Sequence, residues 1–182
     1  MAGGPLEGVK IIDMTSVVVG PLATQTFADH GADVIKVENP AGDTTRYLPD
    51  GRRPGMSGMF VNLNRGKRSI VLDLKSPDGH AILSRLVRQS DVFVHSMRFE
   101  AIKRLGWSYE EVKRVRADVI YANLYGYSRQ GPYANWAAYD DTIQGISGLA
   151  MLQAEVMGEP RYVPTVVADK VAGLTAAYAI AM

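Results

Sequence analysis

Short apolar runs alternate with amphipathic stretches along most of this sequence. The runs "VKIIDM" (9–14) and "VIKVE" (34–38) flank a stretch that has apolar residues at helical spacing, an early proline and Gly31 as its stop. Three further β-rich runs follow, at 69–74, 91–96 and 118–124. Strands that alternate with helices form parallel sheets that are covered on both faces. The sequence therefore predicts an α/β fold with a Rossmann-like parallel sheet and helices on both faces.

Helical patterns fill the stretches between these runs. One covers roughly 78 to 90, a short one ends near Gly106, and another opens at Ser108 with Glu111 completing a capping box. After a loop at 126–141, the pattern predicts a helix from about 140 to 150 and a final apolar helix from Lys170 onward. No repeat, low-complexity tract or linker divides the chain, so we expect a single domain.

Composition excludes several classes of function. Twenty basic and nineteen acidic side chains give a net charge of +1, so the overall balance indicates neither a nucleic-acid nor a membrane partner. Cysteine is absent, which excludes disulfides, thiolate nucleophiles and cysteine-ligated zinc, and which fits a cytoplasmic location. No run reaches the ~20 apolar residues of a membrane span. The histidines His30, His80 and His95 lack a second ligand at metal spacing, so no metal site is expected.

The last helical stretch, "DKVAGLTAAYAIAM", is apolar on most sides and has neither a glycine cap nor a closing basic turn. Such a helix exposes apolar surface unless something packs on it. We therefore expect further chain or a partner to cover it, and we interpret the sequence as a fragment of a longer protein.

The first strand and helix, followed by a second strand that ends in Glu38, have the outline of a dinucleotide site. The turn reads "MTSVVVGP", with three valines where glycines would let the backbone approach a pyrophosphate. Gly20–Pro21 is better interpreted as the start of a helix. Neither a dinucleotide site, a P-loop nor a G-x-S-x-G nucleophile elbow is expected.

Two groups of basic residues could hold a phosphate or could be solvated surface, and composition alone favours the surface. The first group brackets the run at 69–74 and consists of Arg65, Lys67, Arg68 and Lys75. The second lies on the short helix and consists of Arg98, Lys103 and Arg104.

Asp169 stands between an apolar run and the final helix. Its residue type and position suit the N-cap of that helix. The same position also suits a nucleophile, because a carboxylate held among apolar neighbours is oriented and partly stripped of water. The local sequence leaves both interpretations open.

Several blocks of the sequence, taken together, resemble the family III CoA-transferases, the group that includes formyl-CoA transferase, carnitine CoA-transferase and α-methylacyl-CoA racemase. The blocks occur in the family's order and close to its spacing over nearly the whole chain, although the family's chains are more than twice as long. They read "PLEGVKIIDMTSVVVGPLATQTFADHGADVIKVENPAGDTTR", "NRGKRSIVLDLKSPDG", "DVFVHSMRFEAIKRLGW", "DVIYANLYGYSRQGPYANWAAYDD" and "VVADKVAGLTAAYAI".

The resemblance implies a transferase that moves CoA from an acyl-CoA thioester to a carboxylic acid, with Asp169 as the nucleophile that forms first an acyl anhydride and then an aspartyl-CoA thioester. It implies no tightly bound cofactor, because the CoA thioester is itself a substrate. It also implies amides near Val17, Val18 and Val19 beside the reacting carbonyl. The residues that it implies around the adenine and phosphates are Leu72, Lys75, Met97 and Arg104.

Some positions depart from the family's pattern. Val18 stands where some members have a glutamine that contacts the intermediate. Tyr139 stands where racemases have a histidine, and a phenol with a pKa near ~10 is a poor proton-exchange base, so a transferase is preferred. Acyl-CoA racemase or epimerase, and a non-catalytic CoA-binding subunit, remain alternatives. The positions where formyl-CoA transferase has basic residues are here Asn39, Tyr125 and Ala137.

The resemblance further implies that residues 1–182 are the N-terminal portion of the large CoA-binding domain, with the small domain and the C-terminal part absent. Family members form interlocked homodimers, so the full-length protein is expected to do the same.

Overall fold

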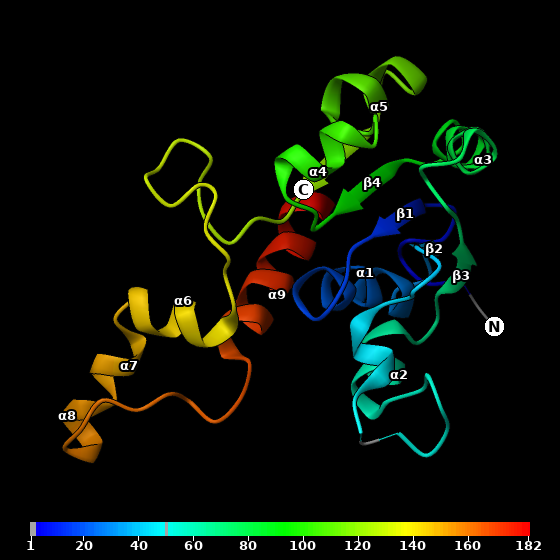
Figure 1. Ribbon diagram of the computed structural model, residues 1–182. Coiled ribbons are helices and arrows are strands. Elements are labelled where there is room, and N and C mark those ends of the chain that lie inside the picture. The colour runs from blue at the N-terminus through cyan, green and yellow to red at the C-terminus, as the bar shows by residue number, and fades with distance from the viewer. Residues whose placement is uncertain (1–2, 50) are drawn as a thin grey trace.

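The computed structural model describes residues 3–49 and 51–182. Five strands form a single sheet in the order β3-β2-β1-β4-β5, and every neighbouring pair is parallel (Figure 1). The predicted parallel α/β sheet is therefore confirmed. The strands are β1 (Lys10–Met14), β2 (Asp33–Glu38), β3 (Arg68–Val71), β4 (Val92–His95) and β5 (Ile120–Asn123).

Helices cover both faces of this sheet. Side chains alternate along a strand, so Ile11 packs toward one face while Ile12 packs toward the other. On the Ile11 side lie α1 (Val19–Asp29) and α9 (Val167–Ala181). The Ile12 side is covered by α3 (Pro77–Val87), α4 (Phe99–Arg104) and α5 (Tyr109–Val115).

Most of the predicted helix ends are confirmed. Gly31, with φ +97°, ends α1, and Gly106, with φ +72°, follows α4. The Ser108 amide donates to the Glu111 carboxylate at 3.0 Å, which completes the capping box of α5. The third strand is shorter than predicted because Ser76 accepts from the Gly79 amide and starts α3 at residue 77, which draws the chain beyond Val71 into a turn.

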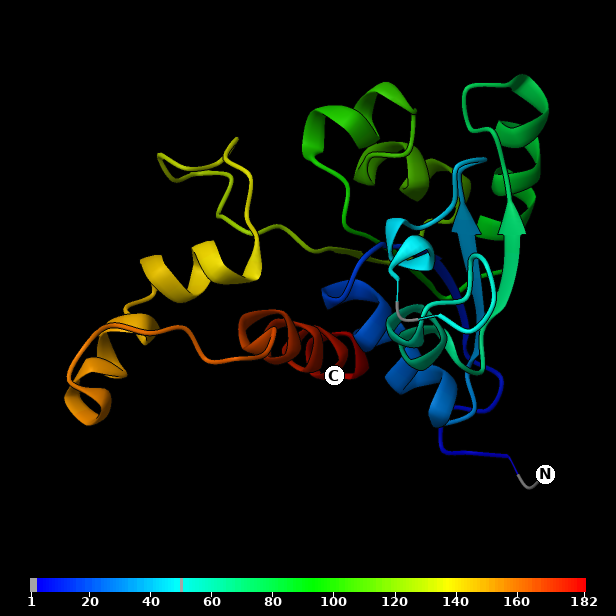
Figure 2. The same cartoon turned by 60° about the horizontal axis from the view of Figure 1, so that its bottom comes forward.

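Other elements differ from the prediction. A 3-10 helix η1 (Thr44–Tyr47) and a short helix α2 (Gly58–Asn64) were not expected. The helix predicted at 140 to 150 is broken, because Gly148 takes φ +81°. Three short helices, α6 (Asp140–Ile146), α7 (Leu149–Leu152) and α8 (Ala154–Met157), replace it and project from the main body (Figures 1 and 2). Among the described helices, none has both the length and the apolar character needed to cross a membrane.

Helix α9 lies against α1, with its N-terminal end toward the start of α1 (Figure 2). It begins at Val167, two residues before Asp169, so the interpretation of Asp169 as the N-cap is wrong. Gly173 is buried where the helices meet, and a Cβ added there would lie 2.6 Å from the Val19 carbonyl oxygen. Since Asp169 and Gly173 are four residues apart on one helix, they share the face that meets α1. The close contact at Gly173 therefore sets the distance of Asp169 from the start of α1.

Substituting Gly173→Ala should force α9 away from α1, because the neighbouring atom is rigid backbone. We expect a loss of about 1–3 kcal/mol in the free energy of unfolding, despite the higher helix propensity of alanine. Gly145→Ala in α6 is the matched control, since its added Cβ would meet only the Tyr162 hydroxyl at 3.9 Å. It should be neutral or slightly stabilising in urea denaturation. Equal losses for the two variants would contradict this account of the packing.

Candidate active site

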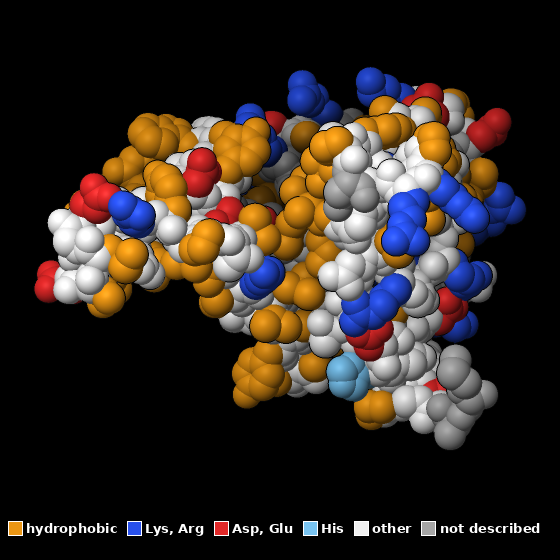
Figure 3. Space-filling model, turned by 90° about the horizontal axis from the view of Figure 1, so that it is seen from below, with side chains coloured by type: hydrophobic (Ala, Val, Ile, Leu, Met, Phe, Trp, Pro, Cys, Tyr) orange, Lys and Arg blue, Asp and Glu red, His pale blue; other side chains and the backbone are white. Residues whose placement is uncertain are grey.

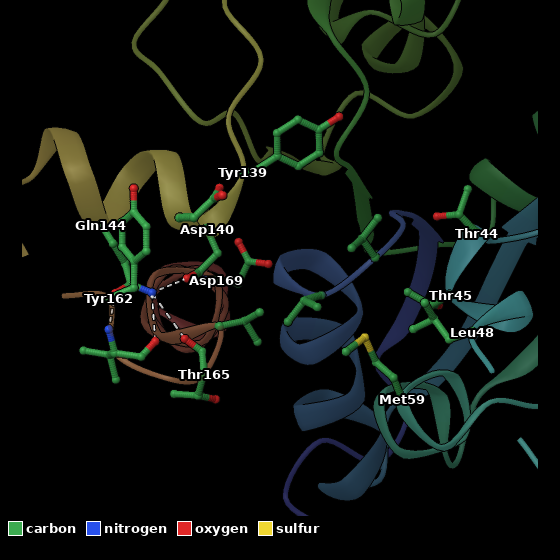
Figure 4. A pocket seen from close by; sticks show the side chains of 15 residues that line it. Thr44, Thr45, Leu48, Met59, Tyr139, Asp140, Gln144, Tyr162, Thr165 and Asp169 are labelled. Carbon is green, nitrogen blue, oxygen red and sulfur yellow. Dashed lines mark hydrogen bonds between the residues drawn. The ribbon is translucent and has the colours of Figure 1, made fainter. Parts of the chain in front are cut away.

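Two cavities open near the carboxyl ends of the strands, where loops follow a parallel sheet. The Asp169 cavity, of about 580 Å³, lies between the start of α1, η1 and α2 on one side and α6 and α9 on the other (Figure 4). The second cavity, of about 600 Å³, is lined by the segments that follow β1, β2, β3 and β4, and we call it the strand-end cavity. Ser16 and Asp43 line the strand-end cavity, whereas their chain neighbours Val17 and Thr44 line the Asp169 cavity. A narrow wall of these two segments therefore separates the cavities.

The Asp169 carboxyl group points from the first turn of α9 into its cavity, toward the start of α1 (Figure 4). It is half-buried, and this burial raises its pKa above the ordinary value, with the negative charge of Asp140 adding to the effect. The backbone amide of Asp169 donates to Asp140 Oδ1 at 2.9 Å. Asp169 is thus a weaker acid than usual, and its carboxylate is correspondingly more basic.

Gln144 anchors the segment that leads into α9. Its side chain is buried, and its Oε1 accepts from the Val163 amide at 2.8 Å. Its Nε2 donates to Asp140 Oδ2 at 2.6 Å and lies within 3.4 Å of the Val163 and Thr165 carbonyl oxygens. The amide group of Gln144 therefore fixes both Asp140 and the approach to Asp169.

The turn before α1 has an unusual backbone. Val17 has φ +68°, and within residues 3–49 and 51–182 it is the one residue other than glycine with a positive φ. A left-handed conformation costs a β-branched residue about 1–3 kcal/mol, so the surroundings must impose it. The Val17 amide already donates to the Asp43 carboxylate, at 3.3 and 3.4 Å. Val18 and Val19 are the N-cap and first residue of α1, where amides lack an intrahelical acceptor.

The residues predicted at the nucleotide end are only partly brought together. Leu72, Lys75 and Met97 line the strand-end cavity. Arg104 is exposed at the end of α4 and does not line it, although its neighbour Leu105 does. Tyr139 is 71% exposed and lines the Asp169 cavity.

The predicted basic group around β3 does not form a phosphate site. Arg65 pairs with Asp29, Arg68 pairs with Asp33, and Lys67 is buried against Asp13. These three residues lie at the amino end of the strand, whereas Lys75 lies beyond its carboxyl end. Solvated surface is also wrong for Lys67, whose side chain is 1% exposed.

The remaining candidate acids and histidines have structural partners. Burial lowers the pKa of His95 to about 4, so its ring is neutral at pH 7. Although burial raises the pKa of Glu38, hydrogen bonds led by that from Arg46 lower it to about 2. His30 Nδ1 lies 2.7 Å from the Thr26 carbonyl oxygen, and the His80 ring lies 4.5 Å from the Trp107 ring at a tilt of 31°. In the described part of the chain, no group of three acidic or histidine side chains could hold a metal ion.

Sequence reasoning missed Asp43, Asp140 and Gln144. Asp43 had a local signal, since an aspartate followed two residues later by a threonine is typical of a turn in which the side chain accepts from the backbone. It accepts from the Thr45 amide at 3.0 Å. Asp140 and Gln144 act on residues 163 to 169, and no local pattern announces contacts across that separation.

Comparison with known proteins gives the family of this chain. The family model described as CoA-transferase family III matches residues 6–182. The succinate–glutarate CoA-transferase of Agrobacterium fabrum is 39% identical over 97% of this chain, which corresponds to 46% of that protein. The acetyl-CoA:oxalate CoA-transferase of Acetobacter aceti is 40% identical over 86% of this chain and 40% of that protein. A crystal structure of a CAIB/BAIF family protein from Brucella suis matches 98% of this chain and 48% of its own, with 36% identity and a TM-score of 0.93. The chain spans less than half the length of these relatives.

Proposed function

This chain belongs to CoA-transferase family III, and we propose that it carries the acyl-transfer centre of an enzyme that moves CoA from an acyl-CoA thioester to a carboxylic acid, with Asp169 as the nucleophile. The observation that carries the proposal is the half-buried Asp169 carboxyl group in one cavity with Val17 and Val18 at the start of α1. A basic, partly desolvated carboxylate next to helix N-terminal amides suits attack on a thioester.

The chemistry proceeds in two symmetrical halves. Asp169 attacks the thioester carbonyl carbon, the C–S bond breaks, and CoA leaves as a thiolate, so that the acyl group and Asp169 form a mixed anhydride. The thiolate attacks the aspartyl carbonyl, which releases the donor acid and leaves an aspartyl-CoA thioester. The acceptor carboxylate then displaces the thiolate to form a second anhydride. Attack of the thiolate on the acceptor's carbonyl gives the new thioester and frees Asp169.

Two features of this chain would serve these steps. The amides of Val18 and Val19 would stabilise the oxyanion of each tetrahedral intermediate, whereas the Val17 amide is already used by Asp43. Apolar side chains around the Asp169 cavity, among them Val18, Leu48 and Met59, would exclude water that would hydrolyse the anhydrides.

The strand-end cavity would hold the nucleotide part of CoA. Leu72 and Met97 offer apolar contacts for an adenine ring, and Lys75 offers an ammonium group for a phosphate. From there the pantetheine arm would cross the wall at Ser16 and Val17 to bring its thioester to Asp169. Arg104 would reach a phosphate only from the rim, since it lies outside the cavity lining.

Wider properties of the protein are also proposals. These relatives are named for succinate, glutarate, oxalate and acetyl-CoA, and we propose small carboxylic acids of this class as donor and acceptor. An interlocked homodimer, a cytoplasmic location and the assignment of residues 1–182 to the N-terminal portion of a larger CoA-binding domain are proposed on the family resemblance alone.

Acyl transfer through an anhydride predicts that an acceptor oxygen ends up in Asp169. Turnover of succinyl-CoA with glutarate labelled with ¹⁸O in both carboxylates should raise the mass of the peptide that contains Asp169 by about two daltons per labelled oxygen. Intact-mass spectra after brief acid quench should also show an acyl or CoA adduct.

The alternatives give different results in the same experiment. A racemase would leave the protein unlabelled and would exchange the α-proton of a chiral acyl-CoA with D₂O. A non-catalytic CoA-binding subunit would show neither label nor adduct, and that result would contradict the proposed transferase.

A further inference from the structure

The buried carboxylate of Asp43 lies where the two cavities meet. Its side chain is 1% exposed and accepts from the Thr45 amide at 3.0 Å and the Thr45 hydroxyl at 2.8 Å. The Lys36 ammonium group, also 1% exposed, lies 3.0 Å from Asp43 Oδ2. The Asp43 amide donates to Glu38 Oε2 at 3.0 Å. Asp43 is therefore fixed from several sides and cannot move with a substrate.

The ion pair of Lys36 and Asp43 holds the turn before α1 at two points. Lys36 Nζ donates to the Thr15 carbonyl oxygen at 2.9 Å, and Asp43 accepts from the Val17 amide. Between them, the Ser16 amide donates to the Ser96 hydroxyl at 3.1 Å. The left-handed conformation of Val17 is thus imposed by hydrogen bonds on both sides of it.

The conformation of Val17 decides where the first amides of α1 point. Val17 and Val18 line the Asp169 cavity, whereas Asp43 and Ser16 line the strand-end cavity. A residue that held Val17 from behind would therefore aim the Val18 and Val19 amides without touching the acyl group.

Building on the proposed function, we propose that Asp43 is a positioning residue for acyl transfer, which holds the left-handed turn at Val17 so that the first amides of α1 face the carbonyl that Asp169 attacks. The hollow beside the projecting helices is visible in Figure 3, between hydrophobic side chains on both sides. Hydrophobic walls orient a carbonyl poorly, so its alignment depends on the backbone of this turn.

Asp43→Asn is the test variant, because it keeps the size of the side chain but removes its charge and one acceptor. With succinyl-CoA and glutarate, we expect kcat to fall by about 10- to 100-fold while KM for succinyl-CoA changes by less than about threefold. Hydrogen exchange at residues 17 to 20 should become faster. Asp91→Asn removes a carboxylate that accepts from the Lys10 amide at the other end of the sheet, outside both cavities, and it should lower kcat far less.

Rescue by glycine separates positioning from a general structural role. Glycine adopts positive φ without strain, so Val17→Gly should make the turn independent of Asp43. In the Val17→Gly background, Asp43→Asn should lower kcat by less than about threefold, and this comparison holds even where Asp43→Asn alone does not fold. A loss of tenfold or more in that background would overturn the inference. Failure of the proposed function would look different, because the full-length unmodified protein would then show no turnover.

Discussion

Asp169→Asn is expected to lower the rate of CoA transfer by a factor on the order of 10³ or more, since an amide cannot form the anhydride. The adduct and the ¹⁸O label should disappear with it. For the unmodified protein, the rate should rise with pH through the pKa of Asp169, because only the carboxylate attacks. Burial and Asp140 raise that pKa, so the rise in rate should occur at a higher pH than the titration of an ordinary aspartate. Rates of succinyl-CoA consumption from pH 4 to 8 measure both effects.

Loss of folding must be excluded as the cause. A raised pKa means that the folded state binds the proton more tightly than the unfolded chain, so charged Asp169 lowers stability above its folded pKa. Asparagine removes this cost and also the favourable charge at the N-terminus of α9, so the unfolding midpoint at pH 7 should change little. Asp141→Asn, an exposed acid of the same cavity, is the matched control and should lower the rate by less than about threefold. A folded Asp169→Asn variant with near-normal turnover would rule out the proposed nucleophile.

The sheet was predictable because its signals are local. Runs such as "VKIIDM" and "DVFVHS" carry their strand tendency within six residues, and the glycines and capping box that end helices lie within one turn of them. Alternation of strands and helices then fixes the parallel arrangement. The helix predicted at 140 to 150 was wrong because Gly148, a residue type that helices tolerate, here adopts a positive φ that ends the helix.

The site was less predictable because its contacts join distant segments. Asp169 was identified through the family resemblance, while its raised pKa comes from its burial and, in addition, from the charge of Asp140 in another helix. The run "VIKVE" carries two charged residues, Lys36 and Glu38, and both are buried in the sheet. Their partners Asp43 and Arg46 come from η1 and the loop before it. A sequence pattern shows that a charge is present, but not which opposite charge will accompany it into the interior.

Lys67→Met should be among the most damaging substitutions for stability. Lys67 Nζ donates to Asp13 Oδ2 at 2.9 Å, to Asn64 Oδ1 at 2.9 Å and to the Pro21 carbonyl oxygen at 3.0 Å. Burial alone would raise the pKa of Asp13, but Lys67 and then Lys36 lower it to about 2. Methionine leaves the Asp13 carboxylate buried without its nearest cation, and we expect a loss of about 3–5 kcal/mol in the free energy of unfolding at pH 7. Urea denaturation measures this loss.

Two comparisons decide whether the buried pair is the cause. Arg68→Met, at the next residue along the chain, removes an exposed ion pair and should cost less than about 1 kcal/mol. Asp13→Asn with Lys67→Met removes both charges and should recover much of the loss, because no unpaired charge remains inside.

The depressed pKa of Asp13 stabilises the fold above the unfolded value of 3.8, and this stability is lost as the pH falls toward 2. The unmodified protein should therefore lose stability between pH 4 and 2, while the double variant should lose less. Equal instability of the single and double variants would contradict this account. The loss of stability would then come from packing at position 67 and not from the uncompensated charge of Asp13.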